Sequence, residues 1–344
     1  MYNLVRSALF KIDAEVSHDV SLDLLAAGHR LGVNRFLFDS VPDSPVDVMG
    51  LTFPNAIGLA AGLDKNAEAF EALGAMGFGF VEVGTVTPKG QAGNPKPRLF
   101  RLPEHDAIIN RMGFNNKGID PMLERIKQHT YKGILGVNIG KNLSTSVEDA
   151  VQDYLACLNA VIPYADYITA NISSPNTPGL RSLQFGDSLA ELIAPLVAAK
   201  QRFFEEEGKQ VPLAVKISPD MSDDELKMVA DTLLKLNVDG IIATNTTLSR
   251  EYVNGHPLAE EAGGLSGMPV REASTKVVHT LSQHLQGALP IIGVGGVFSG
   301  TDAIEKLQAG ASLVQLYSGF IYQGPSLVRE AVLHTSGFLK EINR

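Results

Sequence analysis

Eight short apolar segments, each followed by a stretch with helical periodicity, recur along this chain from residue 57 onward. The segments are rich in β-branched residues and nearly free of charge, a pattern typical of strands buried on both faces. Parallel strands joined by eight helical crossovers predict a TIM (β/α)8 barrel. A doubly wound open sheet is the alternative, but it would not need eight repeats of this regularity. The segments are IGLAAG (57–62), FVEVGTV (80–86), GILGVNIG (133–140), YITANIS (167–173), LAVKISP (213–219), GIIATNT (240–246), PIIGVGG (290–296) and LVQLYSG (313–319).

The connections between these segments include clear helices and three long intervals. The helix expected at 222–237 opens with the capping signal SDDE. The other predicted helices include 66–77, 147–165 and 301–310. The long intervals follow the second, fourth and sixth strands, so in a barrel they lie at the face where loops build the active site. They span residues 87–117, 174–187 and 247–270.

Two features are expected within the long intervals. The runs RLFRL (98–102) and AIINRMGF (107–114) predict a hairpin, because two apolar segments flank a short polar turn. The glycine-rich run GGLSG (263–267) predicts a loop.

Composition limits the class of protein. The chain has 344 residues and is 44% hydrophobic, and α/β barrels of this length form one domain. A net charge of −9 argues against nucleic acid as a partner. The single cysteine, Cys157, excludes an intramolecular disulfide and a cysteine-ligated metal or iron–sulfur site. A single cysteine also favours a reducing compartment. The helical spacing of Cys157 with Tyr154 and Val161 predicts a buried helix residue rather than a nucleophile. We expect no metal, no signal peptide and no membrane-spanning segment.

Residues 1–45 form a region separate from the predicted barrel domain at 46–344. NLVRSALFKI and VSLDLLAAGHRLGV each predict an amphipathic helix, with a polar break at Asp13–Asp19 between them. Such helices could close the bottom of the barrel, or they could lie on a membrane surface. Four Lys/Arg against six Asp/Glu make no polybasic patch, so charge does not decide between the two.

Polar side chains gather at the C-terminal ends of six predicted strands. A polar group inside a buried strand is costly unless it is paired. Repetition of this feature at one end of the barrel therefore predicts a polar ligand across the mouth. After the fourth strand, NISSPNTPGLR adds the hydroxyls of Ser173 and Ser174 and the amide of Asn176, groups suited to a ligand with amide edges. The strand-end residues are Lys65, Asn66, Thr85, Asn138, Asn171, Lys216, Thr244, Asn245 and Thr246.

Glycines follow the last two strands, where barrels commonly bind phosphate. GVGG (293–296) and YSGF (317–320) place backbone N–H groups at this position, and glycine allows close approach of a ligand. The helix that begins near Pro325 is expected to add a positive N-terminus.

Lys216 has two possible roles. With a lowered pKa it could form a Schiff base, as in class I aldolases, or it could stay charged and stabilise an anion such as a reduced flavin. The surrounding Asn and Thr residues favour the flavin. No His and no acidic pair stands at a strand end, which argues against metal-dependent or glycoside hydrolysis. Glu82, inside the second strand, is expected to be an ion-pair partner in the barrel interior.

Over essentially its whole length, the chain resembles the class 2 dihydroorotate dehydrogenases, which are membrane-associated and use quinone. No other flavin barrel known to us shares the full set of motifs. The motifs are GLAAGLDKN (58–66), EVGTVTPKGQAGNPKPRLFRL (82–102), INRMGFNN (109–116), GVNIGKN (136–142), NISSPNTPGLR (171–181), AVKISPD (214–220), ATNTTL (243–248), GGLSG (263–267), IIGVGG (291–296) and LVQLYSGFIY (313–322).

The resemblance implies an oxidoreductase of de novo pyrimidine (UMP) synthesis that converts (S)-dihydroorotate to orotate. It implies a flavoprotein in which FMN N5 takes the hydride from C6, a quinone reoxidises the FMN, and a base removes the proton from C5. The matching base here is Ser174, whereas class 1 relatives use a cysteine. A serine hydroxyl is a poor base at its ordinary pKa, and the sequence places no His or carboxylate beside it.

The resemblance also implies two sets of binding residues. The FMN set is Ala61, Gly62, Lys65, Thr85, Asn138, Asn171, Lys216, Thr244, Gly267, Gly296, Tyr317 and Ser318. The dihydroorotate set is Lys65, Asn110, Arg111, Met112, Gly113, Phe114, Asn171, Asn176, Asn245 and Thr246. Within the second set, Lys65 would pair with the substrate carboxylate, and the Asn amides would bind the ring's amide edges.

In class 2 proteins the N-terminal region gives quinone access at the membrane surface. We expect this protein to lack the transit peptide and membrane-spanning segment of animal members. The resemblance therefore implies a monomer bound peripherally to the cytoplasmic face of the bacterial inner membrane, in contact with lipid and a membrane quinone. Three other possibilities stay open: a Schiff-base aldolase, a non-catalytic FMN-binding barrel, and a soluble enzyme similar to class 1 that uses fumarate.

Overall fold

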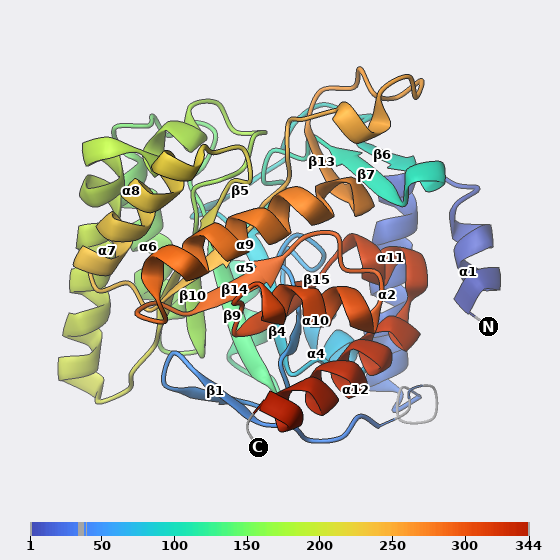
Figure 1. Cartoon of the computed structure of the whole chain (residues 1–344), viewed down its shortest axis with the longest axis horizontal. Helices are drawn as coiled ribbons and strands as arrows, with labels where there is room; N and C mark the ends of the chain where they lie inside the picture. Colours follow the sequence, from blue (N-terminus) through green and yellow to red (C-terminus); the bar gives the residue numbers. More distant parts are fainter. Residues whose placement is uncertain (1, 34–37, 39, 343–344) are drawn as a thin grey trace.

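The computed structural model describes residues 2–33, 38 and 40–342. Its centre is a closed barrel of eight parallel strands, which confirms the predicted TIM barrel (Figure 1). Each predicted apolar segment contributes one strand, and every residue in seven of the eight is buried. In order around the barrel the strands are β3 (Ile57–Leu59), β4 (Phe80–Val86), β9 (Ile134–Ile139), β10 (Tyr167–Asn171), β11 (Leu213–Ile217), β12 (Gly240–Ala243), β14 (Ile291–Val294) and β15 (Leu313–Leu316).

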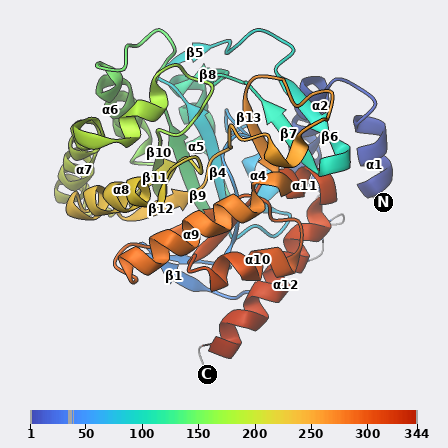
Figure 2. The ribbon, with the colours of Figure 1, turned by 45° about the horizontal axis from the view of Figure 1, so that its top comes forward.

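Helices surround the barrel and cover its outer face (Figures 1 and 2). The predicted capping signal is confirmed: the Ser222 hydroxyl accepts from the Glu225 N–H, and the Glu225 carboxylate accepts from the Ser222 N–H. The helices are α4 (Phe70–Gly74), α5 (Ile119–Ile126), α6 (Ala150–Val161), α7 (Gly186–Glu207), α8 (Asp223–Lys235), α9 (Arg271–Leu285), α10 (Gly300–Gln308), α11 (Ser318–Gln323) and α12 (Pro325–Ile342).

The helix predicted at 66–77 is shorter than expected. Ala67 has a left-handed backbone with φ of 56°, and the Asp64 carboxylate accepts from the backbone N–H groups of Glu68 and Ala69. These bonds hold residues 64–69 in a loop, because a side chain that binds nearby backbone groups competes with the helix. The helix therefore begins only at Phe70.

The bottom of the barrel is closed by a hairpin of β1 (Val46–Val48) and β2 (Leu51–Phe53). Phe53 contacts Phe80, at the start of β4, with ring centroids 5.1 Å apart. The Met49 side chain lies against Gly240, at the start of β12. The prediction that the N-terminal helices could close this end is therefore wrong, since the hairpin occupies it.

A small sheet covers part of the barrel mouth. β6 (Leu99–Leu102) and β7 (Ala107–Asn110) form the predicted hairpin, and β13 (Gly264–Gly267) pairs antiparallel with β7. The GGLSG run thus contributes a strand rather than a loop, because β7 supplies a partner that is distant in the sequence: Gly264 pairs with Asn110, and Gly267 pairs with Ala107. A second pair, β5 (Lys89–Gln91) with β8 (Asn116–Gly118), lies in the same long interval.

The N-terminal helices α1 (Tyr2–Leu9) and α2 (Ala14–Arg30) pack beside α11, α4 and β6 (Figure 1). The predicted polar break at Asp13–Asp19 is mostly helical. The Asp13 carboxylate accepts from the N–H groups of Glu15 and Val16 and so caps the start of α2. Polar residues at this position start a helix instead of interrupting one.

A buried ion pair joins Glu15 of α2 to Arg98, which directly precedes β6. Arg98 donates two hydrogen bonds to the Glu15 carboxylate, at 3.0 and 2.5 Å, and two more to the backbone carbonyls of Ala92 and Asn94. Both side chains of the pair are at most 7% exposed. Burial alone would raise the pKa of Glu15, but the hydrogen bonds and charge of Arg98 outweigh it, and the pKa is lowered.

Replacing Arg98 with methionine is expected to lower the free energy of unfolding by about 3 kcal/mol, because it leaves the Glu15 carboxylate buried without its partner. Thermal unfolding measures the loss. Lys96→Met is the matched control, since the Lys96 side chain is 62% exposed and lies 3.3 Å from the same carboxylate. A lowered pKa in the folded state means that the contribution of Glu15 is present above its unfolded pKa. The Arg98→Met deficit should therefore shrink as the pH falls through the folded pKa; equal melting temperatures for the two variants would contradict the prediction.

Candidate active site

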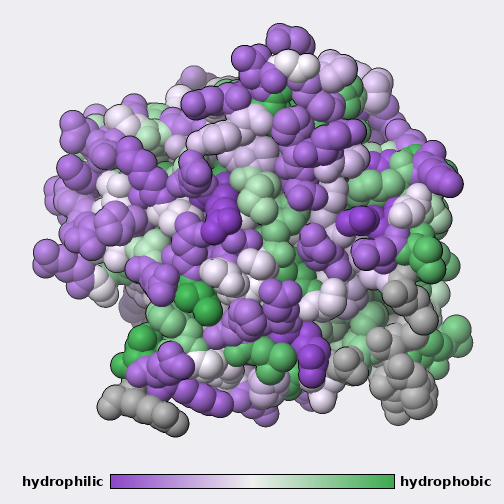
Figure 3. Space-filling view, turned by 45° about the vertical axis from the view of Figure 1, so that its right-hand side comes forward, coloured by the Kyte–Doolittle hydropathy of each residue, from purple (hydrophilic) through white to green (hydrophobic). Residues whose placement is uncertain are grey.

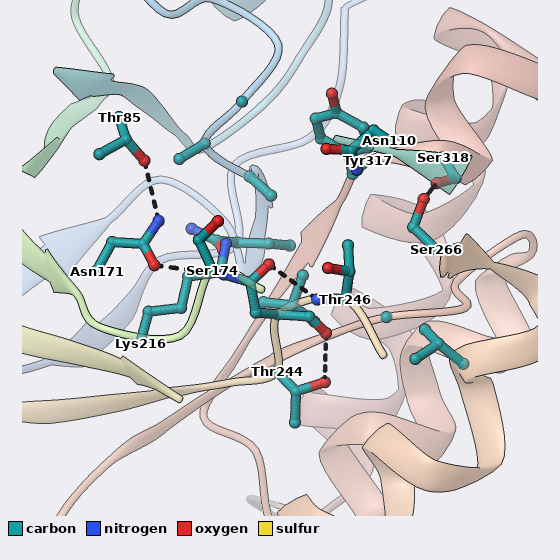
Figure 4. Close-up of a pocket in the computed structure, with 18 of the residues that line it drawn as sticks. Thr85, Asn110, Asn171, Ser174, Lys216, Thr244, Thr246, Ser266, Tyr317 and Ser318 are labelled. Carbon is teal, nitrogen blue, oxygen red and sulfur yellow. Dashed lines mark hydrogen bonds between the residues drawn. The ribbon is translucent and has the colours of Figure 1, made fainter. Parts of the chain in front are cut away.

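A cavity of about 1000 Å³, partly open to solvent, lies at the C-terminal ends of the barrel strands. Its walls come from the barrel strands, from the loops that follow them and from the small sheet over the mouth (Figure 4). This is the position at which barrel enzymes bind their substrates.

Most of the predicted site residues line this cavity. They are Ala61, Gly62, Lys65, Thr85, Asn110, Gly113, Phe114, Asn171, Ser174, Asn176, Lys216, Thr244, Asn245, Thr246, Gly267, Gly296, Tyr317 and Ser318. Asn138, Arg111 and Met112 do not line it. Asn138 is fully buried behind Thr85 and accepts a hydrogen bond from its hydroxyl. The Arg111 guanidinium pairs with Glu261 at 2.6 Å at the edge of the small sheet.

Strand register brings Thr85, Asn171 and Lys216 together. Asn171 pairs with Lys216 across β10 and β11, so both side chains leave the sheet on the same side. Thr85 lies at an irregularity in the β4–β9 register, where a bulge re-aims a side chain. The Asn171 amide donates to the Thr85 hydroxyl at 2.9 Å (Figure 4).

Ser174 is 6% exposed and lines the cavity. Its hydroxyl oxygen accepts from the Asn176 backbone N–H at 3.2 Å. Arg181 holds the start of this loop by donating to the carbonyls of Ser173 and Thr246. Within the described chain, no hydrogen bond joins Ser174 to a His or a carboxylate.

Two lysines bring positive charge to the cavity. Burial lowers the pKa of Lys65 to about 8, although the carboxylates of Asp19 and Glu15 on α2 oppose the shift. Burial also lowers the pKa of Lys216, against the opposing charge of Glu82. Neither ammonium has a carboxylate within 4 Å among the described residues, so both can pair with an anionic ligand.

Glycines form the wall opposite the Ser174 loop. Gly267, Gly295 and Gly296 have φ of 97°, 126° and 70°, conformations that favour glycine. A Cβ at Gly296 would lie 2.3 Å from the Cβ of Arg271. The Ser266 and Ser318 hydroxyls lie 2.9 Å apart on the same wall (Figure 4). Backbone N–H groups and hydroxyls of this kind suit a phosphate.

The helix that begins at Pro325, which was expected to place its N-terminus at the phosphate wall, does not line the cavity. α12, which begins at Pro325, lines a separate hollow together with α1. Within the lining of the main cavity, the helical residues at this point are Ser318 and Gly319, the first residues of α11.

Nine lining residues are absent from the two predicted sets of binding residues, although Val294, Gly295 and Gly319 lie within the glycine segments expected to bind phosphate. Gln315 is the most informative of them, since it is a polar residue inside a buried strand, the same signal that identified Lys216. Its Oε1 atom is buried and has no hydrogen-bond partner within the part of the chain that is described, so a ligand N–H would satisfy it. The other residues absent from those sets are Ala60, Pro175, Ser266, Val270, Val294, Gly295, Val297 and Gly319.

A parallel barrel with a polar cavity, two lysines and a glycine wall at its mouth defines a TIM-barrel enzyme for an anionic, polar-edged ligand. A sequence model of the family described as dihydroorotate dehydrogenase matches residues 44–334. The chain belongs to the dihydroorotate dehydrogenase family, in its quinone-dependent class 2.

Individual relatives support this membership. The chain is 75% identical over 343 residues to a dihydroorotate dehydrogenase (quinone) of Marinomonas sp. (strain MWYL1), which covers 100% of this chain and 99% of the relative. It is 61% identical to a protein of the same name from Saccharophagus degradans, over 96% and 98% of the two chains. A crystal structure of Eimeria tenella DHODH in complex with ferulenol has a TM-score of 0.88 at 39% identity, over 96% of this chain and 93% of that one.

Proposed function

We propose that this chain oxidises (S)-dihydroorotate to orotate, with FMN as its bound cofactor and a quinone as electron acceptor, in pyrimidine nucleotide synthesis. One arrangement carries the proposal: the Ser174 hydroxyl and the Lys65 ammonium share a cavity with the amides of four asparagines. Those groups complement a flat ring that has amide edges, a carboxylate and an acidic C–H bond.

The residues fit FMN at the glycine wall and the floor. The hydroxyls of Ser266 and Ser318 and the backbone of Gly295 and Gly296 would hold the phosphate. The unpaired Gln315 Oε1 would accept from a ring N–H, and Lys216 would offset negative charge on the ring. When bound, FMN supplies the acceptor for the hydride and passes two electrons to the quinone.

The protein's own part in the reaction is to bind, orient and deprotonate the substrate. Lys65 would pair with the carboxylate, while Asn110, Asn171, Asn176 and Asn245 would bind the ring amides. Ser174 Oγ would then take the proton from C5. Ser174 itself is buried at 6% exposure, which limits the access of water to its Oγ atom.

The test of this proposal is an anaerobic absorbance spectrum of the purified protein before and after addition of dihydroorotate. We expect a flavin band at about 450 nm that bleaches with dihydroorotate and returns on addition of a quinone. A yellow protein that does not bleach would exclude this substrate. A colourless protein that stays free of flavin when FMN is added would exclude the redox function.

The pH dependence of kcat/KM should report the deprotonation of the Lys65 ammonium. The charged form is needed for the substrate carboxylate, and the pKa of Lys65 is about 8 in the free protein. We therefore expect kcat/KM for dihydroorotate to fall about tenfold per pH unit above this value. Lys65→Met should lower kcat/KM and remove this alkaline decrease. A variant that keeps the decrease would show that another group causes it.

We also propose that residues 1–45 form a separate unit that binds a membrane surface peripherally, at the cytoplasmic face in a bacterium, with the protein as a monomer. None of the described helices is long and apolar enough to cross a bilayer. Instead, α1 and α2 expose large apolar side chains, and Figure 3 shows hydrophobic atoms gathered at the side where these helices lie. The exposed fraction is 78% for Leu4, 67% for Leu24 and 80% for Leu31.

Replacing Leu4 and Leu24 with aspartate is expected to lower binding to phospholipid vesicles by at least about tenfold. Burial of each leucine side chain in the lipid would contribute ~1.5 kcal/mol or more to the free energy of binding. Co-sedimentation with vesicles measures the bound fraction. Met228→Asp on α8 is the control, because Met228 is 60% exposed on a different helix. Equal binding of both variants would exclude this face as the membrane contact.

A further inference from the structure

Glu82 is a fully buried carboxylate that the proposed reaction does not use. It lies in β4 and accepts hydrogen bonds from three other strands: from Asn138 Nδ2 at 2.7 Å, from Tyr167 OH at 2.8 Å and from Gln315 Nε2 at 2.8 Å. These partners are neutral, so the expectation of an ion pair was wrong. A carboxylate that accepts from every neighbour fixes how each neighbouring amide is turned.

The hydrogen bond between Glu82 and Asn138 determines the direction of the next two hydrogen bonds, which involve Thr85 and Asn171. Because Asn138 turns its Nδ2 toward Glu82, its Oδ1 faces Thr85 and accepts from the Thr85 hydroxyl at 2.6 Å. That bond uses the only hydroxyl proton of Thr85, so the Thr85 oxygen can only accept a hydrogen bond from the next residue of the network. Asn171 supplies the donor, with Nδ2 at 2.9 Å.

The direction of these bonds extends into the cavity. With Nδ2 committed to Thr85, the Oδ1 of Asn171 faces the other way and accepts from Ser173 Oγ at 3.2 Å and Asn245 Nδ2 at 3.3 Å. Asn245 in turn leaves its Oδ1 to accept from the Thr246 N–H at 2.8 Å. Asn171, Asn245 and Thr246 all line the cavity.

We infer that Glu82 is a positioning residue for the substrate: it sets the direction of a hydrogen-bond chain, Glu82–Asn138–Thr85–Asn171–Asn245, and thereby which atoms of the two cavity amides face the ligand. The inference rests on the proposed function, since the ligand that the two amides would bind is dihydroorotate or orotate. Each member of the chain has its donors and acceptors matched, so reversing one amide leaves its neighbours mismatched.

The charge of Glu82 agrees with this role. The carboxylate opposes the effect of burial on Lys216 and favours its ammonium form. Of its other bonded partners, Tyr167 is fully buried and does not line the cavity, whereas Gln315 lines the cavity and is 1% exposed. Glu82 therefore acts on the ligand site through other residues.

Binding of orotate, followed by its effect on the flavin absorbance of the purified holoprotein, tests the inference. Glu82→Gln keeps the size of the side chain but presents an N–H donor where the network has only donors. We expect it to weaken orotate binding by at least about tenfold. Glu82→Asp keeps an acceptor and should weaken binding less. A role in packing alone predicts the opposite order, because the shorter side chain leaves a cavity. Asp166→Asn is the matched control: Asp166 accepts from the Leu135 N–H at the bottom of the barrel.

A Glu82→Gln protein that binds orotate as tightly as Asp166→Asn, or more tightly than Glu82→Asp, would overturn the inference. If Glu82→Gln does not fold, a comparison of Thr85→Val with Thr85→Ser tests the inference, because only serine keeps the hydroxyl that joins Asn138 to Asn171. Equal orotate affinities of these two variants would overturn the inference. In the double variant Glu82→Gln/Thr85→Val the two losses should not add, and additive losses would count against a chain. Failure of the proposed function is separate, because the wild-type flavin would then not bleach with dihydroorotate.

Discussion

Replacing Ser174 with alanine is expected to slow reduction of the bound flavin by dihydroorotate at least about 100-fold, the usual contribution of a positioned general base. Ser174 is the proposed base at C5, and its oxygen lies in the cavity, where the Asn176 N–H donates to it. That hydrogen bond favours the deprotonated oxygen, and the burial of Ser174 limits the access of competing water. Anaerobic stopped-flow mixing with dihydroorotate measures the rate directly.

Two comparisons separate a lost base from a damaged site. Orotate affinity should change little in Ser174→Ala, because the substrate is bound mainly by Lys65 and the asparagines. Ser174→Cys should retain more of the rate than Ser174→Ala, since a thiol is more acidic than a hydroxyl and can take the proton. A Ser174→Ala protein that reduces its flavin at a near-normal rate would remove Ser174 from the mechanism.

Lys216→Met is expected to have the second large effect: a fall of at least about 100-fold in flavin reduction, with weaker retention of FMN. Lys216 is 5% exposed and lines the cavity, and among the described residues only the charge of Glu82 acts on its pKa, so its ammonium can also stabilise negative charge on a ligand. Lys216→Arg keeps the charge and should lose less. Flavin content and the rate of bleaching measure the two effects separately.

The same lysine distinguishes the main rival chemistry. A Schiff-base aldolase would be trapped by borohydride in the presence of substrate, with an increase in mass at Lys216. We expect no such adduct with dihydroorotate. A trapped adduct on a colourless protein would replace the flavin mechanism with the aldolase one.

Local patterns were sufficient to predict the barrel. All eight strands and the capped start of α8 follow from signals within a few residues, such as apolar runs and the SDDE sequence. The cavity residues could also be predicted, because a polar residue at the end of a buried strand needs a partner. Gln315 meets the same criterion, since it is a polar residue inside the buried strand β15, but it was not predicted.

The remaining features depend on contacts between distant segments. β13 is a strand only because β7 lies beside it, and its glycines give no local preference for one. The polar residues after Asp13 start α2 because the Asp13 side chain turns back on the backbone. The neutral partners of Glu82 come from three other strands, whose relative register the sequence does not reveal.

The burial of Cys157 makes this protein convenient for site-directed labelling. Its side chain is 0% exposed, and burial strongly raises the pKa of the thiol, so the reactive thiolate is suppressed. The sequence contains no second cysteine and no tryptophan. A cysteine that replaces Leu4 or Leu24 would thus carry a spin label or fluorophore at a unique position, without prior removal of the native cysteine. Such a label would report how deeply each N-terminal helix enters a lipid bilayer.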